Sequence, residues 1–209
     1  MRSSKITRIQ QLVALFLLIC IGIMMRYTAS LDVNSSYINV LSYFTIQSNA
    51  IVVGFFLGLR SIFFSGEKKP TYRYELVRGA LTLYMSITVI IYWTLLHHLI
   101  KIPFGLEYFA NIFLHSMAWL ILMADFWAFP PQHQLNWQMI LYWLSYPLLY
   151  SIFTMLRGWQ TNWYPYPFMN PENTGSDIKT FIIFIAMGLV FFAFGLAVIK
   201  FHNRCLKSA

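Results

Sequence analysis

The amino-acid sequence predicts an all-α bundle of six transmembrane helices with both termini in the cytoplasm. Only 11% of its 209 residues are charged, whereas a soluble domain usually carries about 25%. Several apolar runs approach a length of about 20 residues, which a helix needs to cross a bilayer. Lys and Arg gather at one set of ends of these runs, and this bias sets the orientation. We therefore expect a single integral membrane domain over residues 1–209.

The expected spans follow the apolar runs in order. Basic residues precede the first run, which is longer than the apolar core of a signal peptide and lacks a clear cleavage site, so we expect it to be retained. Pro130 and Pro131 end the fourth span, because proline cannot continue a helix. Pro147 is expected to kink the fifth span. The predicted spans are residues 9–25, 38–64, 76–99, 107–129, 137–156 and 177–201.

The basic residues are divided unevenly between the two ends of these spans. With six spans both termini lie on one side, and that side holds eleven of the 15 basic residues. Because Lys and Arg favour the cytoplasmic side, the termini are predicted to be cytoplasmic. The same distribution accounts for the net charge of +8 without nucleic acid as a partner. The outer side carries only Arg26, Lys101, Arg157 and Lys179.

The second span contains a group of polar residues in the stretch LSYFTIQSNAIVV, residues 41–53. Thr45, Ser48 and Asn49 fall on one face of a helix, and Gln47 points nearly the opposite way. Polar side chains at membrane depth cost free energy unless they face the protein interior or a cavity. We therefore predict that this face forms a site in which Ser48 and Asn49 contact a substrate. The simpler alternative is that these two residues only join helices.

His115 in the fourth span is the candidate partner of this face. Counted from the outer ends of their spans, Thr45 and His115 lie at depths of roughly 8 Å and 12 Å, so both can occupy one layer of the outer leaflet. Asn111 precedes His115 by one helical turn, and its carbonyl could accept the proton of one imidazole nitrogen. Thr45 would then offer its hydroxyl to the other nitrogen, in the nucleophile–base–orienter pattern of acyl transfer. Alternatively, Thr45 bonds within its own helix and His115 bridges helices.

Four other positions are assigned roles from their place in the chain. Asp125 lies about 15 Å along its helix from the mid-span histidine, too far to touch that ring, and is expected to be an interfacial cap or loop partner. Arg157 ends the fifth span in the layer of the proposed site. There it either snorkels to the interface or binds a substrate carboxylate through two hydrogen bonds. An aromatic, proline-rich loop containing Trp163, Tyr164 and Tyr166 suits a membrane interface and is expected to cover the outer mouth of the site.

Other functions remain open from the residues alone. One is a transporter of a small solute or lipid that uses the same polar cavity, which a cavity open to both membrane faces would favour. Another is a haem protein with His97 and His115 as ligands, and a third is an assembly or signalling protein without chemistry. Cys20 and Cys205 should lie at different depths, so no disulfide framework is expected. No metal-ligand spacing is present, and no motif specifies an oligomeric state.

The chain resembles a bacterial group of six-span integral membrane proteins over nearly its whole length. The shared segments are SYFTIQSN (42–49), the mid-span His115, YPLLYSIFTMLRG (146–158) and WYPYPF (163–168). More distantly the chain is similar to the animal androgen-induced family of multi-span threonine hydrolases, which cleave esters of fatty acids with hydroxy fatty acids. The resemblance implies a protein of the bacterial cytoplasmic membrane that acts on a lipid ester and requires no metal or organic cofactor.

Individual residues match the pattern of that family. The family's nucleophile is a Thr that follows an aromatic-rich turn into an early span, as Thr45 does in SYFT. Its essential His follows an Asn by four residues, as His115 follows Asn111, and its late Tyr-Pro-Phe element is matched by residues 166–168. The segment after the Thr departs from the family in its extra polar groups. We therefore expect a membrane-embedded lipid ester hydrolase in which Thr45 attacks, His115 moves the proton and Asn111 orients the imidazole.

Overall fold

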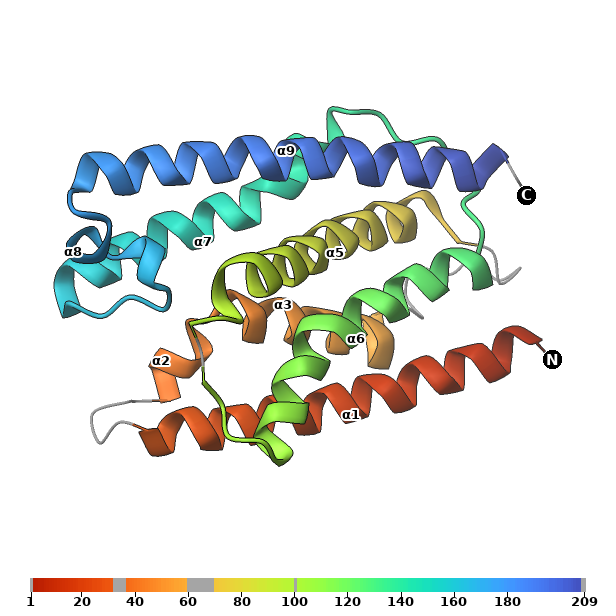
Figure 1. The fold of residues 1–209 in the computed structure, drawn as a ribbon. Coiled ribbons are helices and arrows are strands. Elements are labelled where there is room, and N and C mark those ends of the chain that lie inside the picture. The colour runs from red at the N-terminus through yellow and green to blue at the C-terminus, as the bar shows by residue number, and fades with distance from the viewer. Residues whose placement is uncertain (1, 32–36, 60–69, 100, 208–209) are drawn as a thin grey trace.

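The computed structural model describes residues 2–31, 37–59, 70–99 and 101–207, which form a bundle of helices (Figure 1). Five of these helices are long and apolar enough to cross a membrane, as expected of an all-α, multi-pass membrane protein. The elements are α1 (Arg2–Leu31), α2 (Tyr37–Leu41), α3 (Phe44–Gly54), the π-helical turn η1 (Phe55–Leu59), α5 (Tyr72–Ile91), the π-helical turn η2 (Tyr92–Leu96), α6 (Leu106–Ala128), α7 (Met139–Thr161), the 3₁₀ turn η3 (Pro167–Met169), α8 (Pro171–Thr174) and α9 (Asp177–Lys207).

The helices are arranged around α3 and α5 (Figure 1). α3 packs against α1, α5 and α6, whereas α9 packs against α5 and α7. The N- and C-termini lie at one end of the bundle, and α2 and α8 lie at the opposite end (Figure 1). The chain entering α3 and the loop before α8 therefore meet at the end away from the termini.

The second predicted span, residues 38–64, is not one continuous helix. The helix stops after Leu41 and begins again at Phe44, with Tyr43 in an extended conformation at ψ 130°. α3 and η1 then form a single apolar segment, Phe44–Gly58, which is shorter than the five long helices. Residues 60–64 of the predicted span lie outside the described part of the chain.

Residues of α7 stabilise this break. In an uninterrupted helix the Ser42 carbonyl would accept a hydrogen bond from the amide four residues later. Here it accepts the Tyr150 hydroxyl at 2.8 Å. Arg157 donates to the Ser42 hydroxyl at 3.2 Å and to the side-chain oxygen of Asn39. The polar groups that the break exposes are thus satisfied by side chains more than 100 positions away, which explains why the local sequence does not predict it.

The prediction for Asp125 as an interfacial cap or loop partner is wrong. Asp125 is fully buried and forms an ion pair with Arg78 at 3.2 Å. It also accepts hydrogen bonds from Gln10, at 2.6 Å, and from Tyr74. Arg78 is also fully buried and lies in the second turn of α5, which begins at Tyr72, earlier than the predicted start at residue 76. This network joins α1, α5 and α6.

The predicted fifth and sixth spans correspond to α7 and α9. α7 continues through Pro147 to Thr161, and Asn162 ends it in the left-handed conformation at φ 54°. The loop that follows turns back onto α7 at Gly158. A Cβ placed on Gly158 would come within 2.1 Å of the Tyr164 ring, so only glycine allows the loop to approach so closely.

Candidate active site

Thr45 and His115 are brought together as the sequence predicts. The Thr45 hydroxyl oxygen lies 3.2 Å from Nε2 of His115, although 70 positions separate the two residues. Both side chains are buried, with exposed fractions of 8% and 7%. Because Thr45 occupies the first turn of α3 and His115 the middle of α6, the contact depends on the packing of α3 against α6.

The hydrogen bond at the other imidazole nitrogen fixes the tautomer of His115. Nδ1 lies 2.7 Å from the main-chain carbonyl oxygen of Asn111. A carbonyl oxygen can only accept, so Nδ1 carries the hydrogen and Nε2 presents a lone pair to the Thr45 hydroxyl. This arrangement is the one that a general base needs before it removes a proton.

Asn111 therefore contacts His115 through its main chain. Its side-chain amide instead donates to the Tyr92 hydroxyl at 2.6 Å. Tyr92 is a residue of the site that sequence reasoning missed. In the sequence it is one aromatic residue near the end of an apolar run, indistinguishable from the aromatic residues that collect at membrane interfaces.

Ser48 and Asn49 share the Thr45 face of α3 as predicted, but both are fully buried among helices. The Ser48 hydroxyl lies 3.3 Å from the Thr88 hydroxyl of α5. The Asn49 amide donates to the main-chain oxygens of Thr45, at 2.8 Å, and Leu114, at 2.9 Å. These contacts fit the alternative interpretation, in which the two residues fasten α3 to α5 and α6. Gln47 was predicted to point away from this face, and its side-chain oxygen accepts a hydrogen bond from the Tyr146 hydroxyl of α7 at 2.9 Å.

The loop after α7 places Tyr166 over the beginning of α3. The main-chain N–H of Thr45 donates to the Tyr166 hydroxyl at 3.4 Å. The Tyr166 ring is held edge-on by Tyr43, with centroids 5.6 Å apart, and is stacked on Phe168 at 5.2 Å. Burial raises the pKa of Tyr166 to about 12, so its hydroxyl keeps its proton at neutral pH.

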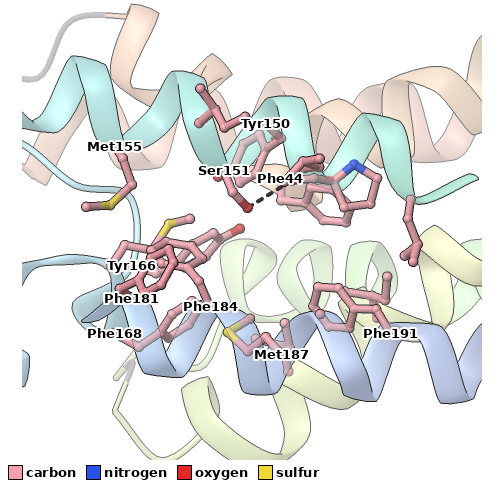
Figure 2. Close-up of a pocket in the computed structure, with 18 of the residues that line it drawn as sticks. Phe44, Tyr150, Ser151, Met155, Tyr166, Phe168, Phe181, Phe184, Met187 and Phe191 are labelled. Atoms are coloured by element: carbon pink, nitrogen blue, oxygen red, sulfur yellow. Dashed lines mark hydrogen bonds between the residues drawn. The ribbon is translucent and has the colours of Figure 1, made fainter. Parts of the chain in front are cut away.

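A large apolar cavity adjoins Thr45 (Figure 2). Its volume is about 1050 Å³, at the upper end of the roughly 300–1,000 Å³ of small-molecule sites. α7 and α9 form most of its walls, Tyr166 and Phe168 close one end, and Thr45 is among the lining residues. His115 is not in the lining and lies behind Thr45. Several lining residues of α7 and α9 are exposed and apolar, so the cavity reaches the surface between these helices, as at Leu148, Ile152, Phe181 and Leu189.

The other predicted contact residues lie outside the cavity lining. The Arg157 guanidinium bonds to the polar groups at the break before α3 and lies 4.8 Å from the centroid of the Trp163 ring. Trp163 also packs edge-on against Tyr43, and Tyr164 packs against Gly158. Of the three predicted loop aromatics, Tyr166 alone lines the cavity. Arg157 and Trp163 instead support the segment that leads into α3.

Among the described residues, no group of three or more His, Cys, Asp and Glu side chains is placed to hold a metal ion. Comparisons of the chain with protein-family models, with curated proteins and with solved structures find no match. The function is therefore argued from the site itself.

Proposed function

We propose that this protein is a membrane-embedded hydrolase of lipid carboxylic esters, with Thr45 as nucleophile and His115 as general base. The observation that carries the proposal is the 3.2 Å contact between the Thr45 hydroxyl and Nε2 of His115, at the wall of a large apolar cavity. A hydroxyl beside a neutral imidazole is the arrangement that activates serine and threonine nucleophiles. The resemblance to the androgen-induced family agrees with this assignment.

The reaction would proceed in two stages. In the first, Thr45 Oγ1 attacks the ester carbonyl carbon while its proton passes to Nε2 of His115. The tetrahedral intermediate then releases the alcohol, which takes that proton, and leaves an acyl group on Thr45. In the second stage His115 accepts a proton from water, the resulting hydroxide attacks the acyl carbon, and Thr45 recovers its proton as the carboxylic acid leaves.

The cavity indicates the kind of ester. Its walls are almost wholly apolar, and burying an alkyl chain in such a space contributes about 0.8 kcal/mol per CH₂ group. A substrate with a long acyl chain therefore fits better than a small polar ester. The exposed apolar walls between α7 and α9 suggest that the substrate enters from the surrounding lipid. An ester of a fatty acid with a hydroxy fatty acid is a substrate of this kind.

The membrane topology belongs to the same proposal. The segment from α2 through η1 is taken to complete a sixth crossing beside the five long helices. Because the termini lie at one end of the bundle, the uneven distribution of basic residues supports a cytoplasmic position for that end and a position in the outer half for the Thr45 site. The location inferred for the protein is the bacterial cytoplasmic membrane.

A covalent probe tests the proposal on the purified protein in detergent. A fluorophosphonate should label wild-type protein at Thr45, and Thr45→Ala should lose both the label and hydrolysis of a long-chain fatty acid ester. Thr45→Ser should keep both, because serine retains the hydroxyl. His115→Asn should lose turnover while the protein remains folded. Ester hydrolysis that survives Thr45→Ala would overturn the assignment.

A further inference from the structure

The Tyr166 hydroxyl lies beside Thr45 but has no role in the reaction proposed for Thr45 and His115. Tyr166 comes from the loop after α7, yet its hydroxyl lies at the first turn of α3, where the Thr45 N–H donates to it at 3.4 Å. The proposed nucleophile is thus contacted by a second polar side chain in addition to His115.

The start of α3 explains why the hydroxyl accepts from the main chain. The first amides of a helix have no partner within the helix, and the side chain of the N-cap residue, Tyr43, makes no capping bond. The Tyr166 oxygen fills this role. Hydrogen bonds received by an oxygen strengthen the bond that its own hydrogen donates, and the positive end of the helix dipole acts in the same direction.

The hydroxyl hydrogen remains available for a substrate. A phenol has one hydrogen to donate. In the described part of the chain the Tyr166 hydroxyl accepts from the Thr45 N–H and donates no hydrogen bond. Because Tyr166 and Thr45 both line the cavity, an ester carbonyl bound at Thr45 Oγ1 would bring its oxygen next to this hydrogen.

We propose that the Tyr166 hydroxyl donates a hydrogen bond to the oxyanion that forms when Thr45 attacks the ester carbonyl. This inference rests on the proposed function. In the tetrahedral intermediate the carbonyl oxygen gains a full negative charge, and a donor already aimed at it stabilises that charge without reorganisation. No proton leaves Tyr166, since the phenol only shares its hydrogen with the oxyanion. When the carbonyl reforms, the charge and the stronger bond disappear together.

The test compares Tyr166→Phe with Tyr43→Phe in detergent-solubilised protein. Removing one oxyanion donor costs roughly 10²–10³-fold in kcat, so Tyr166→Phe should lose that much with KM nearly unchanged. A trifluoromethyl ketone lipid, which forms a tetrahedral adduct with the nucleophile, should bind Tyr166→Phe more weakly by a similar factor. Tyr43→Phe removes a hydroxyl from the ring that packs on Tyr166 and should behave as wild type.

A second variant distinguishes the loss of the hydroxyl hydrogen from a loss of folded structure. Replacing Tyr166 with 3,5-difluorotyrosine keeps the hydroxyl and lowers its pKa, so the group ionises as the pH rises and then has no hydrogen to donate. Activity of this variant should fall with increasing pH over a range in which wild type stays active. A wild-type pH profile, or Tyr166→Phe with kcat within twofold of wild type, would overturn the inference. The proposed function fails separately, if Thr45→Ala retains hydrolysis.

Discussion

The Tyr92 ring lies flat against the His115 imidazole, with centroids 3.8 Å apart and planes 20° from parallel. The stack fixes the face of the imidazole, and the Asn111 carbonyl fixes Nδ1. Only the Nε2 edge is then directed at Thr45. The Asn111 side chain acts on the imidazole only indirectly, because it donates a hydrogen bond to the Tyr92 hydroxyl.

Asn111→Ala should therefore be a mild change. Alanine keeps the main-chain carbonyl that orients His115, and the variant loses only the bond from the amide to Tyr92. A hydrogen bond of this kind contributes about 1 kcal/mol, so kcat should fall by roughly fivefold. Steady-state kinetics beside His115→Asn would check this. A loss as large as that of His115→Asn would instead show that the Asn111 side chain is the orienting group.

Arg157→Lys should lower the hydrolysis of all ester substrates to a similar extent. The guanidinium holds Asn39 and Ser42 at the break before α3, and lysine cannot reproduce a two-pronged hydrogen bond or the contact with Trp163. Loosening the break would shift Thr45 relative to His115 whatever the substrate.

The measurement compares kcat/KM for a lipid ester with a free carboxylate and for its methyl-capped analogue, after the melting temperatures of both proteins are checked. A different result is expected if Arg157 binds a substrate carboxylate, which is the role predicted from the sequence. In that case a loss of about tenfold to a hundredfold, equivalent to a charge-assisted bond of about 1.5–3 kcal/mol, would be confined to the free carboxylate.

Gly188→Phe should restrict the cavity without touching the reacting groups. Gly188 lies on α9 in the cavity lining, and nothing lies within 4 Å of a Cβ built there. The added ring should reduce hydrolysis of long-chain esters by at least about tenfold, because the acyl chain loses its space, while a short-chain ester and fluorophosphonate labelling are little affected. Gly22→Phe on α1, also in open space, is the control. If Gly188→Phe changes the hydrolysis of long-chain and short-chain esters by the same factor relative to wild type, the acyl chain binds elsewhere.

Asp125→Asn should destabilise the fold strongly. Asp125 and Arg78 are fully buried, and removing one partner of such a pair leaves an uncompensated charge, at a cost of about 3–5 kcal/mol. Denaturant titration in mixed micelles measures the change in unfolding free energy. Glu172→Gln, an exposed change near the start of α8, should stay within about 0.5 kcal/mol of wild type. If Asp125→Asn unfolds at the same denaturant concentration as wild type, the ion pair contributes nothing to stability.

Apolar run length was enough to predict the all-α fold, which depends on local spacing that the sequence carries directly. The proximity of Thr45 to His115 was predicted from their similar depths below the outer ends of their spans and from the resemblance to the threonine hydrolases. The break at Ser42 could not be predicted in this way. No proline or glycine marks it, and it exists because Tyr150 and Arg157, from another helix, take up its polar groups.

The same limit applies to the buried ion pair and to Tyr92. Arg78 is one of several basic residues near the start of a span, and its partner lies 47 positions away. Only the packing of α5 on α6 reveals that the two charges meet. Likewise, Tyr92 stacks on His115 from the first position of a π-helical turn, a feature that apolar periodicity does not encode.

The contact between Thr45 and Tyr166 spans 121 positions of the chain, and this has a consequence during biosynthesis. A ribosome that has inserted the helices up to α6 has already delivered Thr45 and His115 to the bilayer. The Tyr166 loop, the residues of α7 that stabilise the break and most of the cavity walls are still to be made. A nascent chain at that stage is surrounded by lipid but lacks a formed site. Hydrolysis would therefore begin only after the last helix is inserted, so the growing protein would not degrade lipids at the translocon.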